Sequence, residues 1–419
     1  MKITNYQIKS VIIHLAFFLM ATLSLLVSKG VSIAPALILL VSFSAFLDKK
    51  KSSITRDDYL IISVLLLYFT AGLADTLLRK QSISNLDLFL RYAIAAWFVF
   101  YLSRFKLHSS MLWLGYAIGA VATGSFAIYA KFHLNMPRVE TSGLNSIHFG
   151  NLSMLLAASC FAGVFWAGTL KYRRLSIAFM FFAGVMAVIA SMLSGTRSGW
   201  VGLPLMLIAF YSFFSDHFQK KYVLSGSLLV VIFITALVFT PQTHVLERID
   251  EAVYGIQQYS QGYSDSSAGI RFEMWRSGYY AFLEKPVFGW GETAFYVYQH
   301  EVVDTYSLND KILNFNHLHN QYIEELAKRG IIGFIALLLL FAIPAKLFLR
   351  RIRAENDHVR ALAAAGLVSV IFMAEFCFTQ AMLRINSGVM FFVFNIVFIW
   401  SAMRSVEQNQ INAVEAKPL

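Results

Sequence analysis

Long apolar runs recur along the whole chain and are separated by short polar connectors. Each run has about 17–22 residues, which is the length that a helix needs to cross the hydrocarbon core of a bilayer. The pattern therefore predicts an all-α polytopic membrane protein with about 12 transmembrane helices. These spans are placed at residues 10–28, 31–47, 59–77, 87–103, 110–130, 148–168, 175–193, 199–215, 222–240, 330–347, 361–380 and 386–402.

Lysine and arginine collect in the connectors that follow every second span, beginning with DKKKSSITRDD at 48–58. Cytoplasmic loops of membrane proteins carry such an excess of positive charge. We therefore expect these connectors and both termini to be cytoplasmic, and the connectors between them to lie outside. The cations concerned are Lys49, Lys50, Lys51, Arg56, Arg104, Lys106, Lys171, Arg173, Arg174, Lys220, Lys221, Arg350, Arg351, Arg353 and Arg360.

One outer connector, 241–329, is far longer than the others. Loops of this length are uncommon unless they fold or carry function. Apolar residues at helical spacing predict an amphipathic helix in it, which lies on the membrane surface or caps the bundle. These residues are Val245, Leu246, Ile249, Val253 and Ile256. The chain thus divides into spans one to nine (1–240), this large periplasmic loop (241–329), spans ten to twelve (330–403) and a loose cytoplasmic tail (404–419).

Composition agrees with a membrane protein and excludes one class of partner. Of the 419 residues, 58% are hydrophobic and 14% are charged, whereas soluble domains carry about 25% charged residues. The net charge of +11 resides mostly in the basic connectors. It therefore reflects topology, and we expect no nucleic acid as a partner. Cys160 and Cys377 both fall in predicted spans, where they act as small apolar residues rather than as a disulfide.

Several arginines fall on the outer side of the predicted topology, against the usual bias. Arg197 lies in the turn SGTRSGW between two spans, and Arg138, Arg271 and Arg384 fall on the same side. An arginine near hydrocarbon costs about 2.5–3.5 kcal/mol on insertion scales, so it needs a partner or a role. One interpretation is a bidentate phosphate site, and the other is an arginine that reaches the headgroup phosphates of lipids.

His317 and His319 form a His-x-His pair before the tenth span. In an extended segment the two rings share a face and could ligate a metal. A zinc site needs three or four ligands, and no third one has a convincing spacing, so we expect no metal. Two interpretations remain for the histidines: a base beside the arginines, or a structural group bonded to backbone at the start of a helix.

Other side chains of the loop are four residues apart, which predicts contacts between them if the segments are helical. Arg271 and Trp275 are four residues apart and would share one face of a helix. Glu324 and Glu325 each have a cation four residues later, which indicates ion pairs that support a helix surface. No phosphate-binding Gly-rich loop, nucleophile elbow or His-Glu-x-x-His motif occurs in the sequence.

The order of these motifs resembles that of the O-antigen ligase and polymerase superfamily of bacterial inner membranes. The shared pattern is an arginine turn between two spans, here SGTRSGW, and an Arg-x-x-x-Trp helix in a large outer loop, here RFEMW. It continues with a P-x-x-G-x-G-like segment, here PVFGWG, and with a His-Asn pair before a Gly-x-x-Gly span, here HLHNQYIEELAKRGIIG. The resemblance covers residues 154–340 best, and the layout of about 12 spans extends it to the whole chain.

The resemblance implies a GT-C-like glycosyltransferase and an O-antigen ligase of lipopolysaccharide biosynthesis. Such an enzyme moves polysaccharide from undecaprenyl diphosphate to a sugar hydroxyl of lipid A–core oligosaccharide, on the periplasmic face of the inner membrane and among membrane lipids. Arg197, Arg271 and His319 are expected to be catalytic, without a cofactor or metal and with inversion of the anomeric carbon. The expected ligands of diphosphate or sugar are Arg138, Arg384, Trp275, His317 and Asn320.

Three other functions stay open. A polymerase of the same superfamily uses the same donor with a different acceptor, and a protein O-oligosaccharyltransferase presents the sugar to a serine or threonine. A 12-span transporter or flippase belongs to a different class. Against the transporter, the two halves of the chain show no parallel pattern, and the one large loop lies late in the sequence.

Overall fold

The computed structural model describes residues 4–46, 52–200 and 245–415, together with positions 202, 224, 228, 231, 232, 235, 239 and 240. In this part the chain forms helices and one isolated β-bridge, between Thr141 and Leu144. Nine of the described helices are long and apolar enough to cross a membrane. The expected all-helical, polytopic architecture is therefore confirmed for the described residues. The spans predicted at 199–215 and 222–240 fall mostly outside them.

The described helices follow the predicted spans one to seven and ten to twelve. The first group is α1 (Asn5–Leu23), α2 (Gly30–Ser42), α3 (Arg56–Leu78), α4 (Asp87–Leu102), α5 (Ser110–Phe132), α6 (Ser146–Gly168) and α7 (Arg173–Leu193). The last group is α13 (Gln321–Leu349), α14 (Asp357–Phe376) and α15 (Asn386–Glu415). The long loop contains α10 (Val245–Ser260), α11 (Ser267–Glu284) and α12 (Glu292–Tyr306). Short 3₁₀ helices are η1 (Phe43–Phe46), η2 (Ile83–Leu86), η4 (Asp310–Asn314) and η5 (Met382–Arg384).

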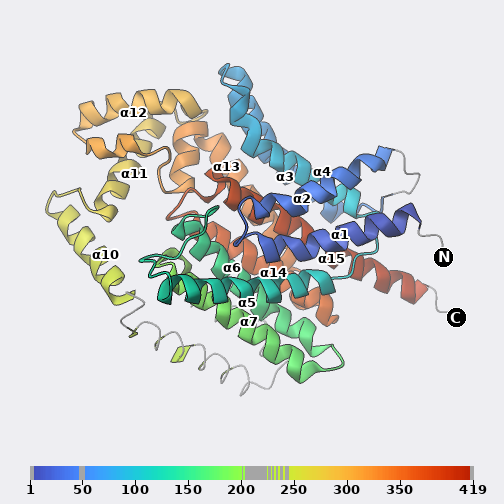
Figure 1. Ribbon diagram of the computed structural model, residues 1–419. Coiled ribbons are helices and arrows are strands. Elements are labelled where there is room, and N and C mark those ends of the chain that lie inside the picture. Colours follow the sequence, from blue (N-terminus) through green and yellow to red (C-terminus); the bar gives the residue numbers. More distant parts are fainter. Residues whose placement is uncertain are drawn as a thin grey trace.

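The centre of the bundle is built from α6, α14 and α15, which are the most deeply buried of the long helices (Figure 1). Helix α6 packs against α5, α7 and α14. Its sequence, SIHFGNLSMLLAASCFAGVFWAG, is rich in glycine, alanine and serine. Small residues let helix backbones approach closely in a membrane, where no difference in hydrophobicity drives the helices together. This helix therefore provides a packed base for the segments at its N-terminal end.

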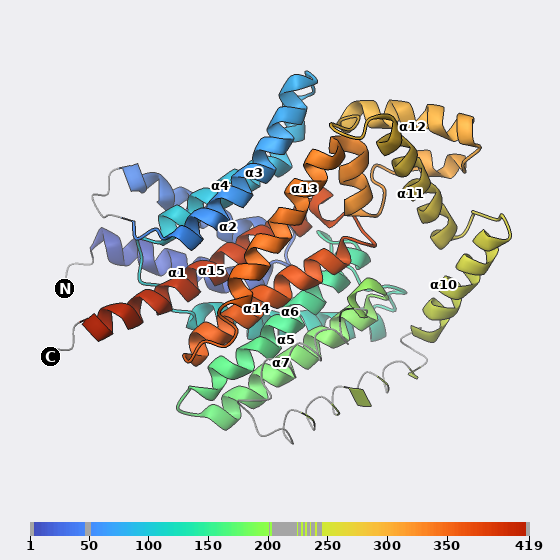
Figure 2. The ribbon, with the colours of Figure 1, turned by 180° about the vertical axis from the view of Figure 1, so that it is seen from behind.

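The two ends of the bundle carry different segments. Both termini lie at one end, and α10, α11 and α12 lie at the other (Figures 1 and 2). At the first end, Arg351 pairs with Asp57 and with Glu407, both at 2.7 Å. At the second end, Arg79 donates a 2.7 Å hydrogen bond to the carbonyl of Gly289. These contacts join the basic connector after α13 to the start of α3 and place the turn after α3 beside the long loop, as the charge pattern predicts.

Two boundaries differ from the sequence-based expectation. Helix α15 continues past Arg404 to Glu415, where a loose tail was expected. The guanidinium of Arg404 donates to the hydroxyl of Thr55 at 3.1 Å, so the start of the expected tail is held against a basic connector. Helix α13 begins at Gln321, inside the predicted loop, and its backbone breaks at Gly330, where φ is 62° and ψ is −158°. That break lies where the tenth span was expected to begin.

The amphipathic helix expected from the apolar spacing is present as α10. It packs against α11. Its apolar side chains remain largely exposed, including Leu246, Ile249, Val253 and Ile256. The helix is therefore confirmed, while its contact with a membrane surface stays a prediction.

Candidate functional site

Helix α11 carries the Arg-x-x-x-Trp motif and holds the histidine segment in place. The hydroxyl of Ser266 caps its first turn by accepting the N–H of Gly269 at 3.0 Å. Trp275 projects toward the segment before α13, because its indole Nε1 donates to the carbonyl of Leu318 at 3.0 Å. That carbonyl belongs to the residue between the two histidines. One side chain of the motif therefore ties α11 to the His-Leu-His segment.

Three of the predicted arginines line one cavity of about 290 Å³, which we call the arginine cavity. Arg138 comes from the loop between α5 and α6, Arg197 from the turn after α7, and Arg271 from α11. Arg138 is positioned by its Nε, which donates to the carbonyl of Ser194 at 3.1 Å. The structure thus brings together residues that are far apart in the sequence. The remaining lining residues are Ile147, Gly195, Thr196, Ser198, Glu251, Ala252, Ile256, Ser267, Ala268, Phe272, Trp275 and Thr379.

The electrostatic environment of Arg271 favours an anion. Burial, followed by the positive charges of Arg197 and Arg138, lowers the pKa of the Arg271 guanidinium. Among the described lining residues, Glu251 is the one acidic side chain. Positive charges held near one another repel, and a negatively charged ligand relieves that repulsion. Planar guanidinium groups also match the geometry of phosphate oxygens.

His319 stands beside this cavity in an unusual backbone conformation. Its φ is +50°, in the left-handed region that residues other than glycine rarely adopt. Burial, then the charges of His317 and Arg271, lowers the pKa of His319 to about 3. The imidazole is therefore neutral near pH 7 and able to accept a proton. The next residue, Asn320, caps α13 by accepting the N–H groups of Tyr322 and Ile323 at 3.0 and 3.1 Å.

Buried polar atoms gather next to the histidines. In the described part of the chain, His317 Nε2, His319 Nδ1 and Gln380 Oε1 are buried without a hydrogen-bond partner. The two rings are 4.2 Å apart between centroids, and the side chain of Gln380 is near enough to each ring to exchange a hydrogen bond with it. Buried polar groups normally have partners, so this cluster fits a polar ligand group such as a hydroxyl. The residue before Gln380, Thr379, lines the arginine cavity, so the polar cluster lies next to that cavity.

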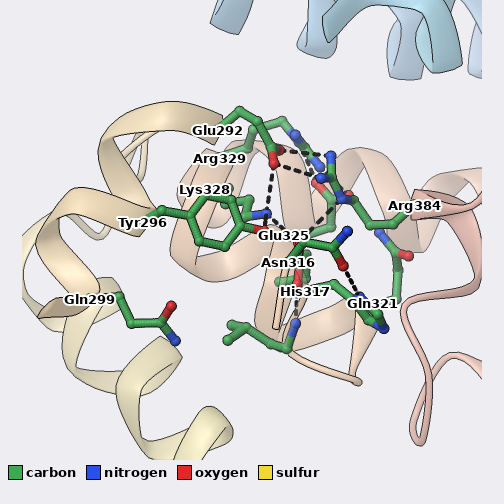
Figure 3. A network of polar contacts seen from close by, with 12 residues as sticks. Glu292, Tyr296, Gln299, Asn316, His317, Gln321, Glu325, Lys328, Arg329 and Arg384 are labelled. Carbon is green, nitrogen blue, oxygen red and sulfur yellow. Dashed lines mark hydrogen bonds and ion pairs between the residues drawn. The ribbon is translucent and has the colours of Figure 1, made fainter. Parts of the chain in front are cut away.

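An ion network lies beside the histidine segment (Figure 3). The carboxylate of Glu324 accepts the N–H of Leu318 at 2.7 Å and pairs with Lys328. Lys328 also contacts Glu292 at 3.0 Å, and Glu292 binds Arg384 through both of its oxygens at 2.6 and 2.8 Å. The structure therefore places Arg384, an expected substrate ligand, in this network and not among the residues that line the arginine cavity.

Glu324 and Glu325 do not support a helix surface, as the sequence spacing had indicated. Both are fully buried, although each pairs with the cation four residues later, as expected. Glu325 Oε1 also accepts hydrogen bonds from the hydroxyl of Tyr68 at 2.6 Å and from Gln321 at 3.0 Å. Spacing identifies such pairs correctly, but it carries no information on which face the fold buries. The surface interpretation is therefore wrong.

The PVFGWG segment fits against the break in α13. Gly330 interrupts the helix, and the preceding carbonyls of Ala327 and Lys328 then accept the N–H groups of Trp290 and Gly291 at 3.0 and 2.7 Å. A Cβ at Gly330 would collide with the backbone of Val287, so the close approach requires glycine. The PVFGWG segment and the Gly-x-x-Gly motif of α13 thus pack directly against each other. This contact positions the start of α12, which carries Glu292.

Sequence reasoning missed Glu292, Tyr296 and Gln380. Glu292 directly follows the PVFGWG turn, and Tyr296 comes four residues later. If this segment is helical, the spacing predicts that the two side chains share one face of the helix. Gln380 is a polar residue at the end of a predicted span, a position that often marks function. Among the described residues, no group of three or more His, Cys, Asp or Glu side chains could hold a metal.

Replacing Glu324 by leucine is expected to lower the free energy of unfolding by about 3–5 kcal/mol. The substitution leaves Lys328 buried with one carboxylate fewer and removes the acceptor of the Leu318 N–H. Thermal or denaturant unfolding of the detergent-purified protein measures the effect. Glu301→Leu, at an exposed position on α12, is the matched control. Equal stability of the two variants would contradict a structural role for the buried pair.

Two comparisons with known proteins bear on this site. Over 370 residues, the chain is 28% identical to an uncharacterized protein of Haemophilus influenzae, with 88% of this chain and 92% of that protein covered. A family model described as O-antigen ligase matches residues 182–338. The matched region contains the turn with Arg197, the Arg271 helix and the His319 segment. The match to the O-antigen ligase family model at residues 182–338 agrees with the resemblance that the motifs had indicated.

Proposed function

We propose that this protein is a glycosyltransferase that transfers polysaccharide from undecaprenyl diphosphate to a sugar hydroxyl of lipid A–core oligosaccharide. The observation that carries the proposal is the arginine cavity with a neutral histidine beside it. The cavity offers positive charge for a diphosphate, and the histidine offers a proton acceptor. The family match supports an enzyme of the O-antigen ligase and polymerase kind.

The proposed reaction is a direct displacement. The acceptor oxygen bonds to the anomeric carbon of the donor sugar, and the bond between that carbon and the diphosphate oxygen breaks. The electron pair leaves with the diphosphate, whose growing charge Arg197 and Arg271 stabilise. The proton of the acceptor hydroxyl passes to His319. Attack from the side opposite the leaving group inverts the anomeric centre.

We place the site on the periplasmic face of the bacterial inner membrane, with both termini cytoplasmic. The positive-inside rule assigns the basic connectors to the cytoplasm. The termini lie at the same end of the bundle as the connector between α13 and α14, and α10–α12 lie at the opposite end (Figure 2). A donor anchored by a polyprenyl chain would then reach the arginine cavity from the membrane.

Deletion of the gene tests the ligase assignment in the bacterium that produces the protein. We expect lipopolysaccharide gels to show core without polymer, while long polymer accumulates on the lipid carrier. The lipid-linked fraction is measured separately, and complementation with the native gene is the control. A core that carries one repeat would instead identify a polymerase, and an unchanged lipopolysaccharide profile would contradict both activities.

A further inference from the structure

A second hollow adjoins the arginine cavity on α10 and α11. Its volume is about 660 Å³, and we call it the aromatic groove. It shares three lining residues with the arginine cavity: Ile256, Phe272 and Trp275. The two hollows are therefore direct neighbours on α10 and α11. The full lining is Ile256, Tyr259, Ser260, Phe272, Trp275, Arg276, Tyr279 and Tyr280.

Helical spacing arranges the rings of this groove. Phe272, Trp275 and Tyr279 recur at intervals of three and four residues, so they follow one face of α11. Tyr259, from the end of α10, closes the other side, with its ring centroid 4.9 Å from that of Phe272. Phe272 and Trp275 meet edge to face at 5.4 Å. Mutual contacts fix these rings, so the groove is formed before a ligand binds.

Polar atoms stand among the rings and are held in place. The carboxylate of Glu273 accepts the hydroxyl of Tyr259 at 2.8 Å and the guanidinium of Arg276 at 2.9 Å. Arg276 itself is exposed, and Tyr279 keeps 57% of its surface exposed. The aromatic faces are thus accessible beside fixed hydrogen-bond donors.

A sugar chain has the chemistry that this surface recognises. A pyranose ring presents a face of C–H groups and a rim of hydroxyls. The C–H face packs on the electron-rich face of an aromatic ring, and the hydroxyls bond to groups such as Arg276. An acyl chain would offer no acceptor to the guanidinium of Arg276, which has five N–H donors.

We propose that the aromatic groove binds the saccharide chain of the lipid-linked donor, beyond the sugar that reacts. This inference rests on the proposed function, because it takes the arginine cavity as the site of the diphosphate. Because the two hollows share Ile256, Phe272 and Trp275, a chain attached to that diphosphate has the aromatic groove next to it along α11. The groove then favours long donors over short ones, since added sugars reach added rings.

The test compares Tyr279→Ala with Tyr279→Phe, which keeps the ring. The donors are lipid-linked saccharides extracted from the producing bacterium and sorted into a single-repeat and a long fraction. Tyr279→Ala is expected to lower kcat/KM about tenfold on the long fraction and at most about twofold on the short one. Tyr279→Phe is expected to stay close to the native rate on both. Tyr254→Ala, at an exposed tyrosine of α10 outside the groove, is the matched control.

Binding of the long saccharide freed from its lipid, measured by calorimetry, separates the groove from the transfer reaction. We expect native protein and Tyr279→Phe to bind it, and Tyr279→Ala to bind about tenfold more weakly. Equal affinity of all three proteins, or an equal loss of transfer on long and short donors, would overturn the inference. Saccharide binding that depends on Tyr279 in a protein that transfers neither fraction would support the groove and contradict the proposed function.

Discussion

Replacing His319 by asparagine is expected to leave the protein folded and inserted while transfer falls by about 100-fold or more. Asparagine tolerates the left-handed backbone that His319 adopts at φ +50°, so the turn before α13 is kept. The substitution removes the ring that accepts the proton of the attacking hydroxyl. Transfer rates of purified protein, at matched expression and donor concentration, measure the effect.

The pH dependence gives this prediction a second readout. In the free protein, burial and the neighbouring charges lower the pKa of His319 to about 3, so the acidic limb of kcat/KM should lie well below pH 6.5. Bound diphosphate adds negative charge beside Arg271 and raises the pKa of the imidazole. The acidic limb of kcat should therefore appear at a higher pH than that of kcat/KM.

Two variants serve as comparisons for His319→Asn. His300→Asn, at an exposed position on α12, should retain native transfer. His317→Ala should cost much less than His319→Asn, because the proposed reaction passes the proton of the acceptor hydroxyl to His319. Transfer by His319→Asn at close to the native rate would show that the histidine only shapes the turn.

The sequence was most informative where one physical rule acts on one segment. Apolar run length placed the described spans, because the bilayer sets the length of a crossing helix. The bias of lysine and arginine sorted the connectors into two groups, and the contacts of Arg351 and Arg79 agree with that sorting. Three of the four arginines that stood against the bias meet in one cavity. The predicted side of the membrane thus grouped residues that lie far apart along the chain.

What the sequence did not predict depends on burial and on packing between segments. The i,i+4 spacing of Glu324 and Lys328 is the same for a solvated pair and a buried one. The ion pair of Arg384 with Glu292 was not predicted, because the two residues are 92 positions apart along the chain. The aromatic groove is lined by residues of both α10 and α11, and neither helix alone shows a sugar-binding pattern. Each of these features arises from contacts between elements and not from periodicity within one.

Replacing Arg197 and Arg271 by lysine is expected to lower transfer strongly although the charge is kept. Each guanidinium can bind two phosphate oxygens at once, and lysine offers one point charge on a flexible stem. A charge-assisted hydrogen bond is worth about 1.5–3 kcal/mol, so each single variant should lose roughly 10- to 150-fold in kcat/KM. The double variant should lose more than either, because both side chains line the same cavity.

Arg353→Lys is the matched control for these variants, since Arg353 is exposed in the connector between α13 and α14. It should transfer at the native rate. If the arginines act mainly on the departing diphosphate, kcat should fall more than KM rises, because the charge they stabilise grows in the transition state. If they only hold the donor, KM should rise while kcat is kept. Near-native transfer by the double lysine variant would show that both arginines act only through their positive charge. That result would contradict the proposal that the arginine cavity binds the diphosphate.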